Sequence, residues 1–235
     1  MASLYHHFRT RALVAAVVFS VSCCAFAGGI TVGGTRIVYP RDAKQEDVSV
    51  RNTSEHSNFL VQSWVEDARG EKSTDFIVTP PLYVSTPGNE NTLRLMYIGN
   101  PLPSDRETLY YFNTKAIPSL DKAQTLGKNV LLFAAVTRIK LFVRPSGLTL
   151  SIADAPDKLT FSYKAGQLTI HNPTPYYLTL TGIRSGSNRL QDIMVSPFGT
   201  AREPLPHGAV ASVVYHTIND FGTTTSSHHA AVSQG

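Results

Sequence analysis

The segment from Asn129 to Pro145, NVLLFAAVTRIKLFVRP, constrains the fold of this chain more than any other. It has seven consecutive apolar residues at 130–136, after which the cations Arg138, Lys140 and Arg144 alternate with apolar residues. A strand buried on one face alternates between apolar and polar residues along its whole length. This segment must therefore lie between two layers of the protein or present one apolar face to something outside the chain.

Residues 1–27 have the pattern of a secretory signal peptide. Arg9 and Arg11 form a basic opening, an uncharged apolar run starts at Ala12, and Ala25-Phe26-Ala27 has the small-residue form of a cleavage site. The apolar run is short for a membrane span, which needs about 20 residues. We expect cleavage after Ala27 and export of the mature chain, with a retained N-terminal anchor as the alternative.

Removal of this segment changes the chemistry of the mature chain. Both cysteines, Cys23 and Cys24, would be lost, so the mature protein could not depend on a disulfide even in an oxidising compartment. Loss of Arg9 and Arg11 leaves 19 cationic and 17 acidic residues, a net charge of +2. This bias is too weak to predict nucleic-acid binding. No other long apolar run is present, so we expect no membrane insertion.

Beyond residue 27 the sequence indicates strands throughout. Short runs rich in Val, Ile, Thr, Leu, Tyr and Phe alternate with clusters of Gly, Pro, Asn, Asp and Ser, and the helical period is nearly absent. The pattern predicts an all-β protein of Greek-key sandwiches. The expected strands are Ile30–Val38, Asp47–Arg51, Phe59–Glu66, Phe76–Val78, Thr92–Ile98, Thr108–Ala116, the segment from Val130, Leu148–Ile152, Leu159–Tyr163, Gln167–His171, Tyr177–Arg184, Asp192–Val195 and Ala211–Thr217.

This number of strands suggests two sandwiches. Arg144-Pro145-Ser146-Gly147 has the breaker residues of a domain junction. We therefore expect a first domain at residues 28–143, a junction at 144–148, and a second domain at 149–235 that ends in a polar tail at 223–235.

Recognisable catalytic and cofactor motifs are missing from the sequence. It has no phosphate-binding glycine loop, no G-x-S-x-G elbow and no H-E-x-x-H motif, and a mature chain without cysteine cannot form a blue-copper site. The pair His228-His229 could bind a metal loosely, but a solvated tail is the preferred interpretation. Asn52-Thr53-Ser54 matches a glycosylation sequon, although turn chemistry is preferred there. We expect no enzyme activity, no metal and no cofactor.

Several motifs together resemble one known family, the PapD-like periplasmic chaperones of the chaperone–usher pathway, which escort pilus (fimbrial) subunits. The resemblance extends over essentially the whole mature chain. The motifs occur in the order that the family shows, and they are Gly34–Pro40, Asn52-Thr53, Val61–Val65, Phe76–Pro81, Asp105–Asn113, Ala116–Pro118, Ile139–Pro145, Asn172–Tyr177 and Ile218–Gly222.

The resemblance implies two immunoglobulin-like domains in an L-shaped, boomerang-like molecule. It places Arg36 and Lys140 in the cleft between the domains, where they would hold the C-terminal carboxylate of a subunit. A guanidinium can bind a carboxylate with two parallel hydrogen bonds, and an ammonium adds a point charge. Without the resemblance, each would be interpreted as a strand-end cation paired with a local acid.

The family also offers an interpretation of the segment 129–145. A pilus subunit is a sandwich that lacks one strand, and the chaperone supplies a strand of its own by donor-strand complementation. The resemblance makes Leu131, Phe133 and Ala135 the donated side chains. The other face, Val130, Leu132, Ala134 and Val136, would then pack in the chaperone's own core. The alternative is that both faces are buried within this chain, as in a central strand.

Three further expectations follow from the resemblance. Glu107, Arg144 and Asp220 would form a charge set that holds the angle between the domains, the alternative being three unrelated surface charges. Ala135 is small where the family often has a larger residue, so the matching subunit pocket would receive less. The loop 119–128 is fairly short, as in the members that build rod-like pili.

The sequence therefore predicts a periplasmic chaperone that delivers pilus subunits to an outer-membrane usher. Its partners would be those subunits and the usher, and the free protein could form a homodimer through its exposed strand edge. The alternatives are a structural sandwich protein, such as a pilus subunit or adhesin, and a secreted hydrolase. Subunits usually have one sandwich and often a cysteine pair, so two sandwiches and a mature chain without cysteine weigh against a subunit. No catalytic constellation supports a hydrolase.

Overall fold

The computed structural model of the chain describes residues 28–119, 131–205 and 211–234. The signal-peptide segment, Val130 and most of the loop 119–128 lie outside these ranges. Strands dominate the described residues, whose one helix is the short 3₁₀ turn η1 (Pro156–Lys158). No helix in the described part is long and apolar enough to span a membrane, and no cluster of metal-ligating side chains occurs there. The prediction of an all-β, two-domain protein is confirmed.

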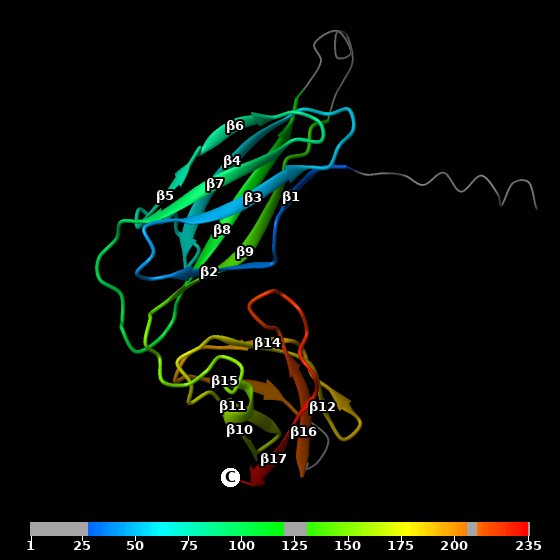
Figure 1. Cartoon of the computed structure of the whole chain (residues 1–235). Helices are drawn as coiled ribbons and strands as arrows, with labels where there is room; N and C mark the ends of the chain where they lie inside the picture. The colour runs from blue at the N-terminus through cyan, green and yellow to red at the C-terminus, as the bar shows by residue number, and fades with distance from the viewer. Residues whose placement is uncertain (1–27, 120–130, 206–210, 235) are drawn as a thin grey trace, which may run out of the picture.

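Domain 1, comprising β1 to β9, consists of two sheets packed face to face (Figure 1). One sheet has four strands in the order β1-β3-β7-β5, and the other has five in the order β2-β9-β8-β4-β6. The strands are β1 (Ile30–Val32), β2 (Arg36–Pro40), β3 (Glu46–Asn52), β4 (Phe59–Asp67), β5 (Phe76–Thr79), β6 (Leu82–Ser85), β7 (Glu90–Tyr97), β8 (Thr108–Pro118) and β9 (Ala135–Arg144).

Alternation along the strands builds the core of domain 1. Buried residues alternate with more exposed ones along β3, β4 and β7, and the apolar ones among them, such as Val48 and Val50, meet Leu141 and Val143 of β9 in one cluster. The polar residues between them face solvent, as expected for antiparallel sheets covered on one side. This core positions β9, because the buried half of that strand is packed on it.

The predicted strand Ile30–Val38 is two strands in the structure. Gly33 and Gly34 separate β1, which pairs with β3 in the four-stranded sheet, from β2, which pairs with β9 in the five-stranded sheet. The sequence expectation was wrong here because two strand-like runs joined by glycines can belong to different layers. The switch has a consequence for the site, since β2 reaches only part of β9.

Domain 2 contains η1 and the remaining strands, which form one continuous sheet in the order β13-β12-β16-β17-β10-β11-β15, with β14 paired to β12. Its core includes Leu168, Ile170 and Leu180. The strands are β10 (Thr160–Lys164), β11 (Gln167–His171), β12 (Leu178–Ser185), β13 (Asn188–Arg189), β14 (Ile193–Val195), β15 (Thr200–Pro204), β16 (Ser212–Thr217) and β17 (His228–Gln234).

Two expectations for domain 2 were wrong. The predicted strand Leu148–Ile152 is irregular, with bends and the start of a turn, although Leu148 and Leu150 still pack against the core. The predicted polar tail at 223–235 contains β17, which lies between β16 and β10 in the sheet. His228 is not a solvated tail residue, because its Nδ1 lies 2.7 Å from a carboxylate oxygen of Asp157 and its ring stacks on Tyr215. This polar segment is a strand because its backbone pairs with β16 and β10, and no local sequence pattern reveals such pairing.

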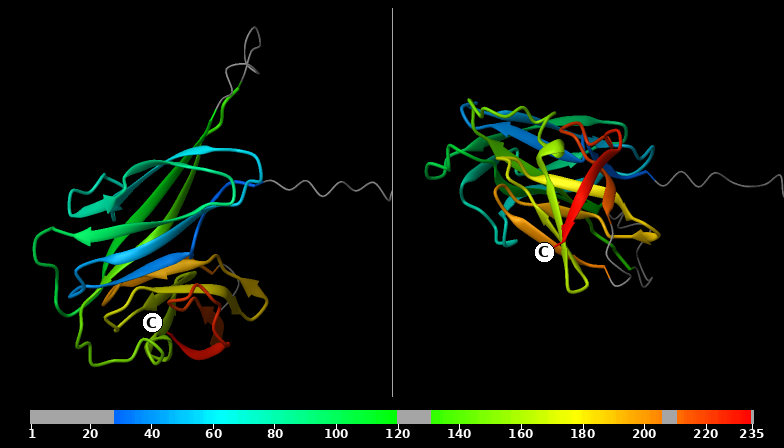
Figure 2. Two further views of the ribbon diagram at one scale, coloured as in Figure 1. Left: turned by 45° about the horizontal axis from the view of Figure 1, so that its top comes forward. Right: turned by 90° about the horizontal axis from the view of Figure 1, so that it is seen from below.

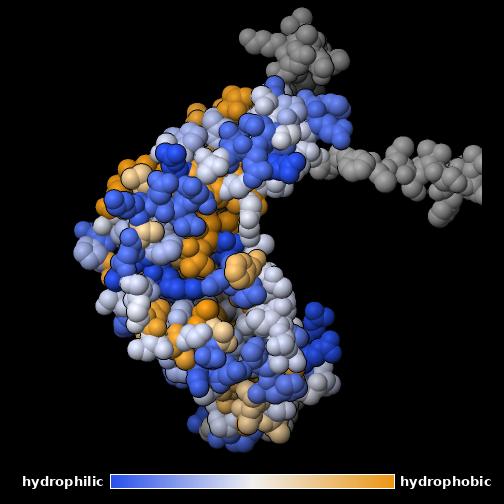
Figure 3. Space-filling model, in the orientation of Figure 1, coloured by the Kyte–Doolittle hydropathy of each residue, from blue (hydrophilic) through white to orange (hydrophobic). Residues whose placement is uncertain are grey.

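The two domains meet at an angle and leave a concave side between them (Figures 1 and 3). The strands β8 and β9 run from this junction to the opposite end of domain 1 (Figure 1). In the left view of Figure 2 their far ends project beyond the rest of the sandwich. One long strand therefore connects the junction with an exposed end of the molecule.

Candidate functional site: the edge of β9 and the cations at the domain junction

The strand β9 has a partner on both sides over only half of its length. It pairs antiparallel with β8 from Ala135 to Val143, but parallel with β2 only from Lys140 to Arg144. Among the described residues, the stretch 135–139 has no ladder partner on the β2 side. The backbone N–H and C=O groups along that edge are therefore available to another strand.

The residues that precede β9 and begin it expose large apolar side chains. Leu131 and Phe133 are 77% and 75% exposed. By alternation they share a face with Ile139 and Leu141, which are buried in the core of domain 1. The core face of the strand thus continues beyond the sandwich, and there nothing in the described chain covers it.

The other face of this segment was predicted to pack in the protein's own core, and that prediction was wrong. Leu132 and Val136 are exposed, and their face continues with Arg138 and Lys140, away from the core cluster. Val130, predicted for the same face, lies outside the described residues. The structure also excludes the alternative of a central strand buried on both faces throughout, because Ala135 and Val136 are exposed within β9 itself.

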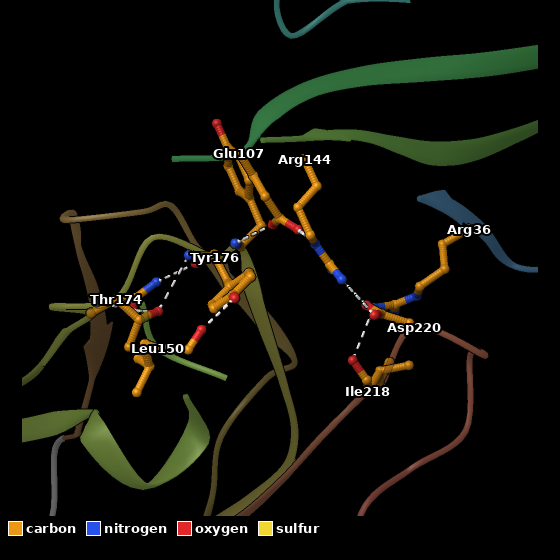
Figure 4. Close-up of polar contacts among 10 residues, drawn as sticks. Arg36, Glu107, Arg144, Leu150, Thr174, Tyr176, Ile218 and Asp220 are labelled. Atoms are coloured by element: carbon orange, nitrogen blue, oxygen red, sulfur yellow. Dashed lines mark hydrogen bonds and ion pairs between the residues drawn. The ribbon is translucent and has the colours of Figure 1, made fainter. Parts of the chain in front are cut away.

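Arg36 and Lys140 come together where the open edge ends. They are partners in the parallel ladder between β2 and β9, and their neighbours Ile37 and Leu141 point into the core. Both cations therefore point away from domain 1, toward domain 2. Nη1 of Arg36 donates a hydrogen bond of 2.9 Å to the carbonyl oxygen of Ile218 (Figure 4). Nζ of Lys140 donates a hydrogen bond of 2.9 Å to Oγ1 of Thr179.

The partners of these two cations are neutral. Within the described chain neither Arg36 nor Lys140 forms an ion pair, and Nε of Arg36 is buried without a hydrogen-bond partner. Burial lowers the pKa of Lys140, and the nearby guanidinium of Arg36 lowers it further. Burial also lowers the pKa of Arg36, against the opposing effect of Asp220 and Glu107. Two half-buried like charges with an unused donor form a site suited to an anion.

The predicted charge set Glu107, Arg144 and Asp220 is assembled in the structure. Nε of Arg144 lies 2.7 Å from Glu107 Oε1, and its two terminal nitrogens each lie 2.7 Å from an oxygen of Asp220 (Figure 4). The other carboxylate oxygen of Glu107 accepts a hydrogen bond of 2.8 Å from the backbone N–H of Tyr177. Because Glu107 and Arg144 belong to domain 1 and the other two to domain 2, this network crosses the junction.

The charge set is largely buried, and burial and ion pairing shift the pKa values of Glu107 and Arg144. Glu107 is almost wholly buried, and burial raises its pKa despite the opposing effect of Arg144 and of the Tyr177 N–H. Burial lowers the pKa of Arg144, but its hydrogen bonds and ion pairs with Asp220 and Glu107 outweigh this and raise it above its usual range. The guanidinium thus stays charged and binds Asp220 in the bidentate geometry that gives strong ion pairs.

Sequence reasoning predicted Asp220 but missed the residues of domain 2 that contact Arg36, Lys140 and Phe142. The hydroxyl of Thr179 and the carbonyl of Ile218 hold the two cations, and the ring of Tyr177 stacks on Phe142 with centroids 5.6 Å apart. A backbone carbonyl carries no sequence signal, and a threonine within a strand is too common to single out. Phe142 lies on the face of β9 opposite the core residues Leu141 and Val143. A large aromatic residue on that face could have indicated that another part of the protein covers it.

Comparison with known proteins decides the family. Residues 29–149 match the family model described as "Pili and flagellar-assembly chaperone, PapD N-terminal domain", and residues 154–229 match "Pili assembly chaperone PapD, C-terminal domain". The chain belongs to the PapD-like pilus-assembly chaperones. Members of this family are chaperones and not enzymes, and its fimbrial chaperones are periplasmic.

Individual relatives agree over most of their length. This chaperone is 46% identical over 209 residues to the probable fimbrial chaperone SfmC of Escherichia coli K12, covering 89% of this chain and 90% of SfmC. It is 46% identical over 198 residues to the chaperone protein FimC of the same strain, covering 84% and 82%. The crystal structure of the periplasmic chaperone SfaE superposes with a TM-score of 0.77 at 40% identity, over 87% of this chain and all of that one.

A further solved structure contains a partner. The SafB chaperone in complex with the Salmonella enterica SafA pilin superposes with a TM-score of 0.78 at 27% identity, over 86% of this chain and 96% of that one.

Proposed function

We propose that this protein captures pilus subunits in the periplasm by adding its strand β9 to them, holds the subunit's C-terminal carboxylate with Arg36 and Lys140, and delivers the subunit to an outer-membrane usher. One observation carries the proposal: among the described residues, the edge of β9 is open at 135–139, and the two cations where it ends form no ion pair. The solved complex of the SafB chaperone with a pilin supports a subunit as the partner. The signal-peptide pattern and the family support the location, and the family supports the usher.

The position of Arg36 and Lys140 at the end of the open edge predicts the direction of the bound strand. The strand β2 runs parallel to β9 and begins at Arg36, opposite Lys140. A subunit strand on the same edge, in line with β2, has its end at that point. If it also runs parallel to β9, its C-terminal carboxylate meets Arg36 and Lys140. Arg36 and Lys140, here called the carboxylate anchor, would then set the register in which the side chains along β9 enter the subunit.

The apolar face supplies most of the expected binding energy. Burial of Leu131 and Phe133 in a subunit would contribute about 1.5–3 kcal/mol each, whereas Ala135 has little area to bury. Hydrogen bonds from a charged group contribute about 1.5–3 kcal/mol each. The anchor therefore adds orientation and register to an affinity that rests largely on apolar contact.

The site spans both domains, so the angle between them belongs to the function. Domain 2 holds each cation through an uncharged oxygen, which fixes the direction of the cation without satisfying its charge. The charge set of Arg144 fixes the junction a few residues further along β9. When free, the protein has the same open edge and apolar face, so a homodimer formed through them remains part of the proposal.

The proposal is tested by capture of a subunit in the periplasm. A subunit is co-expressed with the wild-type protein, with Lys140→Ala, or with Lys164→Ala, which removes an exposed cation of domain 2 as a matched control. We expect the wild type and Lys164→Ala to co-purify with the subunit, and Lys140→Ala to lose it at unchanged melting temperature. Normal recovery of the subunit with Lys140→Ala would overturn the anchor.

A further inference from the structure

Among the described residues, Phe221 is the most exposed large apolar side chain, at 91% exposure. It lies on a tight turn between β16 and β17, in the loop that rises toward domain 1 in Figure 1. Single exposed apolar residues are common and need no explanation by themselves. This one differs because its turn is rigid and borders the cation pair.

The turn, residues 219–223, is braced from within. The side-chain oxygen of Asn219 accepts hydrogen bonds from the backbone N–H groups of Phe221 at 3.1 Å and Thr223 at 3.0 Å. The N–H of Asn219 donates to the carbonyl oxygen of Thr223 at 2.9 Å. Asp220, next to Phe221, is held by both terminal nitrogens of Arg144. The backbone that carries the phenyl ring is therefore fixed before any partner arrives, which lowers the entropy lost on binding.

The same turn touches the anchor. The residue before it, Ile218, accepts the hydrogen bond from Arg36 (Figure 4). Gly222 has φ of +82° and lies so close to Thr35, the residue before Arg36, that a Cβ at this glycine would overlap the threonine side chain. Phe221 thus projects from the part of domain 2 that is pressed against the start of β2.

Phe221 also borders a cavity of about 350 Å³ in domain 2. Its apolar lining includes Ile152, Leu178 and Ile218. Ile218 lines this cavity, and its carbonyl oxygen accepts the hydrogen bond from Arg36, so the cavity and the cation pair share this residue. An apolar surface therefore lies next to Arg36, one of two cations that form no ion pair within the described residues.

We infer that Phe221 and this cavity bind an apolar or aromatic side chain among the last residues of the anchored chain. A carboxylate held by Arg36 and Lys140 brings the last residues of its own chain to the turn 219–223. The positive charge of the two cations therefore determines which chain end reaches Phe221 and the cavity. This inference rests on the proposed function. It makes Phe221 a residue that determines specificity, favouring subunits whose C-terminal end combines a free carboxylate with an apolar side chain.

The test uses the mature protein and synthetic peptides of alternating apolar residues, with affinities measured by fluorescence polarisation. One peptide ends in Phe-Gln with a free carboxylate, a second in Ala-Gln, and a third is the first with a C-terminal amide. We expect Phe221→Ala to weaken the first peptide about tenfold and the second less than about twofold. Phe221→Leu should restore most of the loss. Ile98→Ala, which removes an exposed apolar side chain of domain 1, should change neither affinity.

The amide peptide separates the two proposals. If amide and acid bind the wild type equally, the carboxylate anchor fails. If the acid is preferred but Phe221→Ala weakens both acid peptides equally or neither, the anchor stands and the role of Phe221 is refuted. Loss of self-association in sedimentation experiments with Phe221→Ala, without a change in peptide affinity, would assign the surface to a second copy of the chain and overturn the inference.

Discussion

The two ends of the segment 131–144, which contains β9, have similar apolar residues and opposite surroundings. At its C-terminal end, Leu141 and Val143 are buried in the core of domain 1, and Phe142 is covered by Tyr177 of domain 2. At the other end, Leu131 and Phe133 continue the core face of the same strand and are largely exposed. The difference comes from neighbours: the C-terminal half lies between β2 and β8, and the N-terminal half pairs with β8 alone.

This comparison shows that apolar side chains at the exposed end are not required for the stability of the free protein. A side chain contributes to the free energy of unfolding only if folding removes it from water. The buried end therefore holds the domain and its junction, and we interpret the exposed end as reserved for a partner. Changes at the two ends should consequently affect different measurements.

The largest expected effect is on subunit binding, from Leu131→Asp combined with Phe133→Asp. Loss of two buried apolar side chains removes about 3–6 kcal/mol of binding free energy, a weakening of more than about a hundredfold. Calorimetric titration with a purified subunit measures it, and the melting temperature should stay unchanged. Ile98→Asp, at another exposed apolar position of domain 1, is the control. A double variant that unfolds, or that binds normally, would refute the donated face.

The second prediction compares identical substitutions at two leucines, Leu141 within β9 and Leu131 just before it. Leu141→Ala should lower the free energy of unfolding by about 2–5 kcal/mol, because it opens a cavity in the core. Leu131→Ala should lower it by less than about 0.5 kcal/mol, since surface substitutions rarely do more. Denaturant unfolding of both variants gives the two values. Equal losses would mean that the exposed end is covered within the free protein after all.

The third and smallest effect concerns Arg144, the last residue of β9. Arg144→Ala leaves Glu107 buried without its counter-ion and should cost about 1–3 kcal/mol, between the values for exposed and fully buried ion pairs. Scanning calorimetry should show the transitions of the two domains moving apart, and small-angle scattering should report a broader range of domain angles. Arg69→Ala, which removes an exposed pair with Asp67, serves as the control. A single unchanged transition in Arg144→Ala would show that the charge set does not fix the junction.

Much of the architecture could be predicted from the sequence, because strands and turns are encoded locally. The alternation of Val48 and Val50, and the breakers around Pro145, indicate sandwich domains without any knowledge of their partners. The motif order pointed to the family, and with it to Arg36 and Lys140, which the structure places opposite each other. The donated face and the carboxylate anchor stay proposals, since they concern a partner chain.

Other features depended on contacts between residues far apart in the chain. Alternation divides residues 131–136 into two faces, but the side chains that cover a face come from other strands. Gly33 and Gly34 separate β1 from β2, yet only the packed sheets show that β2 begins opposite Lys140 and leaves the rest of the edge open. The polar segment after residue 227 becomes a strand because β10 and β16 lie on either side of it. The sequence by itself therefore determined most of the strands and the family. The tertiary structure decided which strands pair and which faces are covered, because burial depends on neighbours that no local pattern specifies.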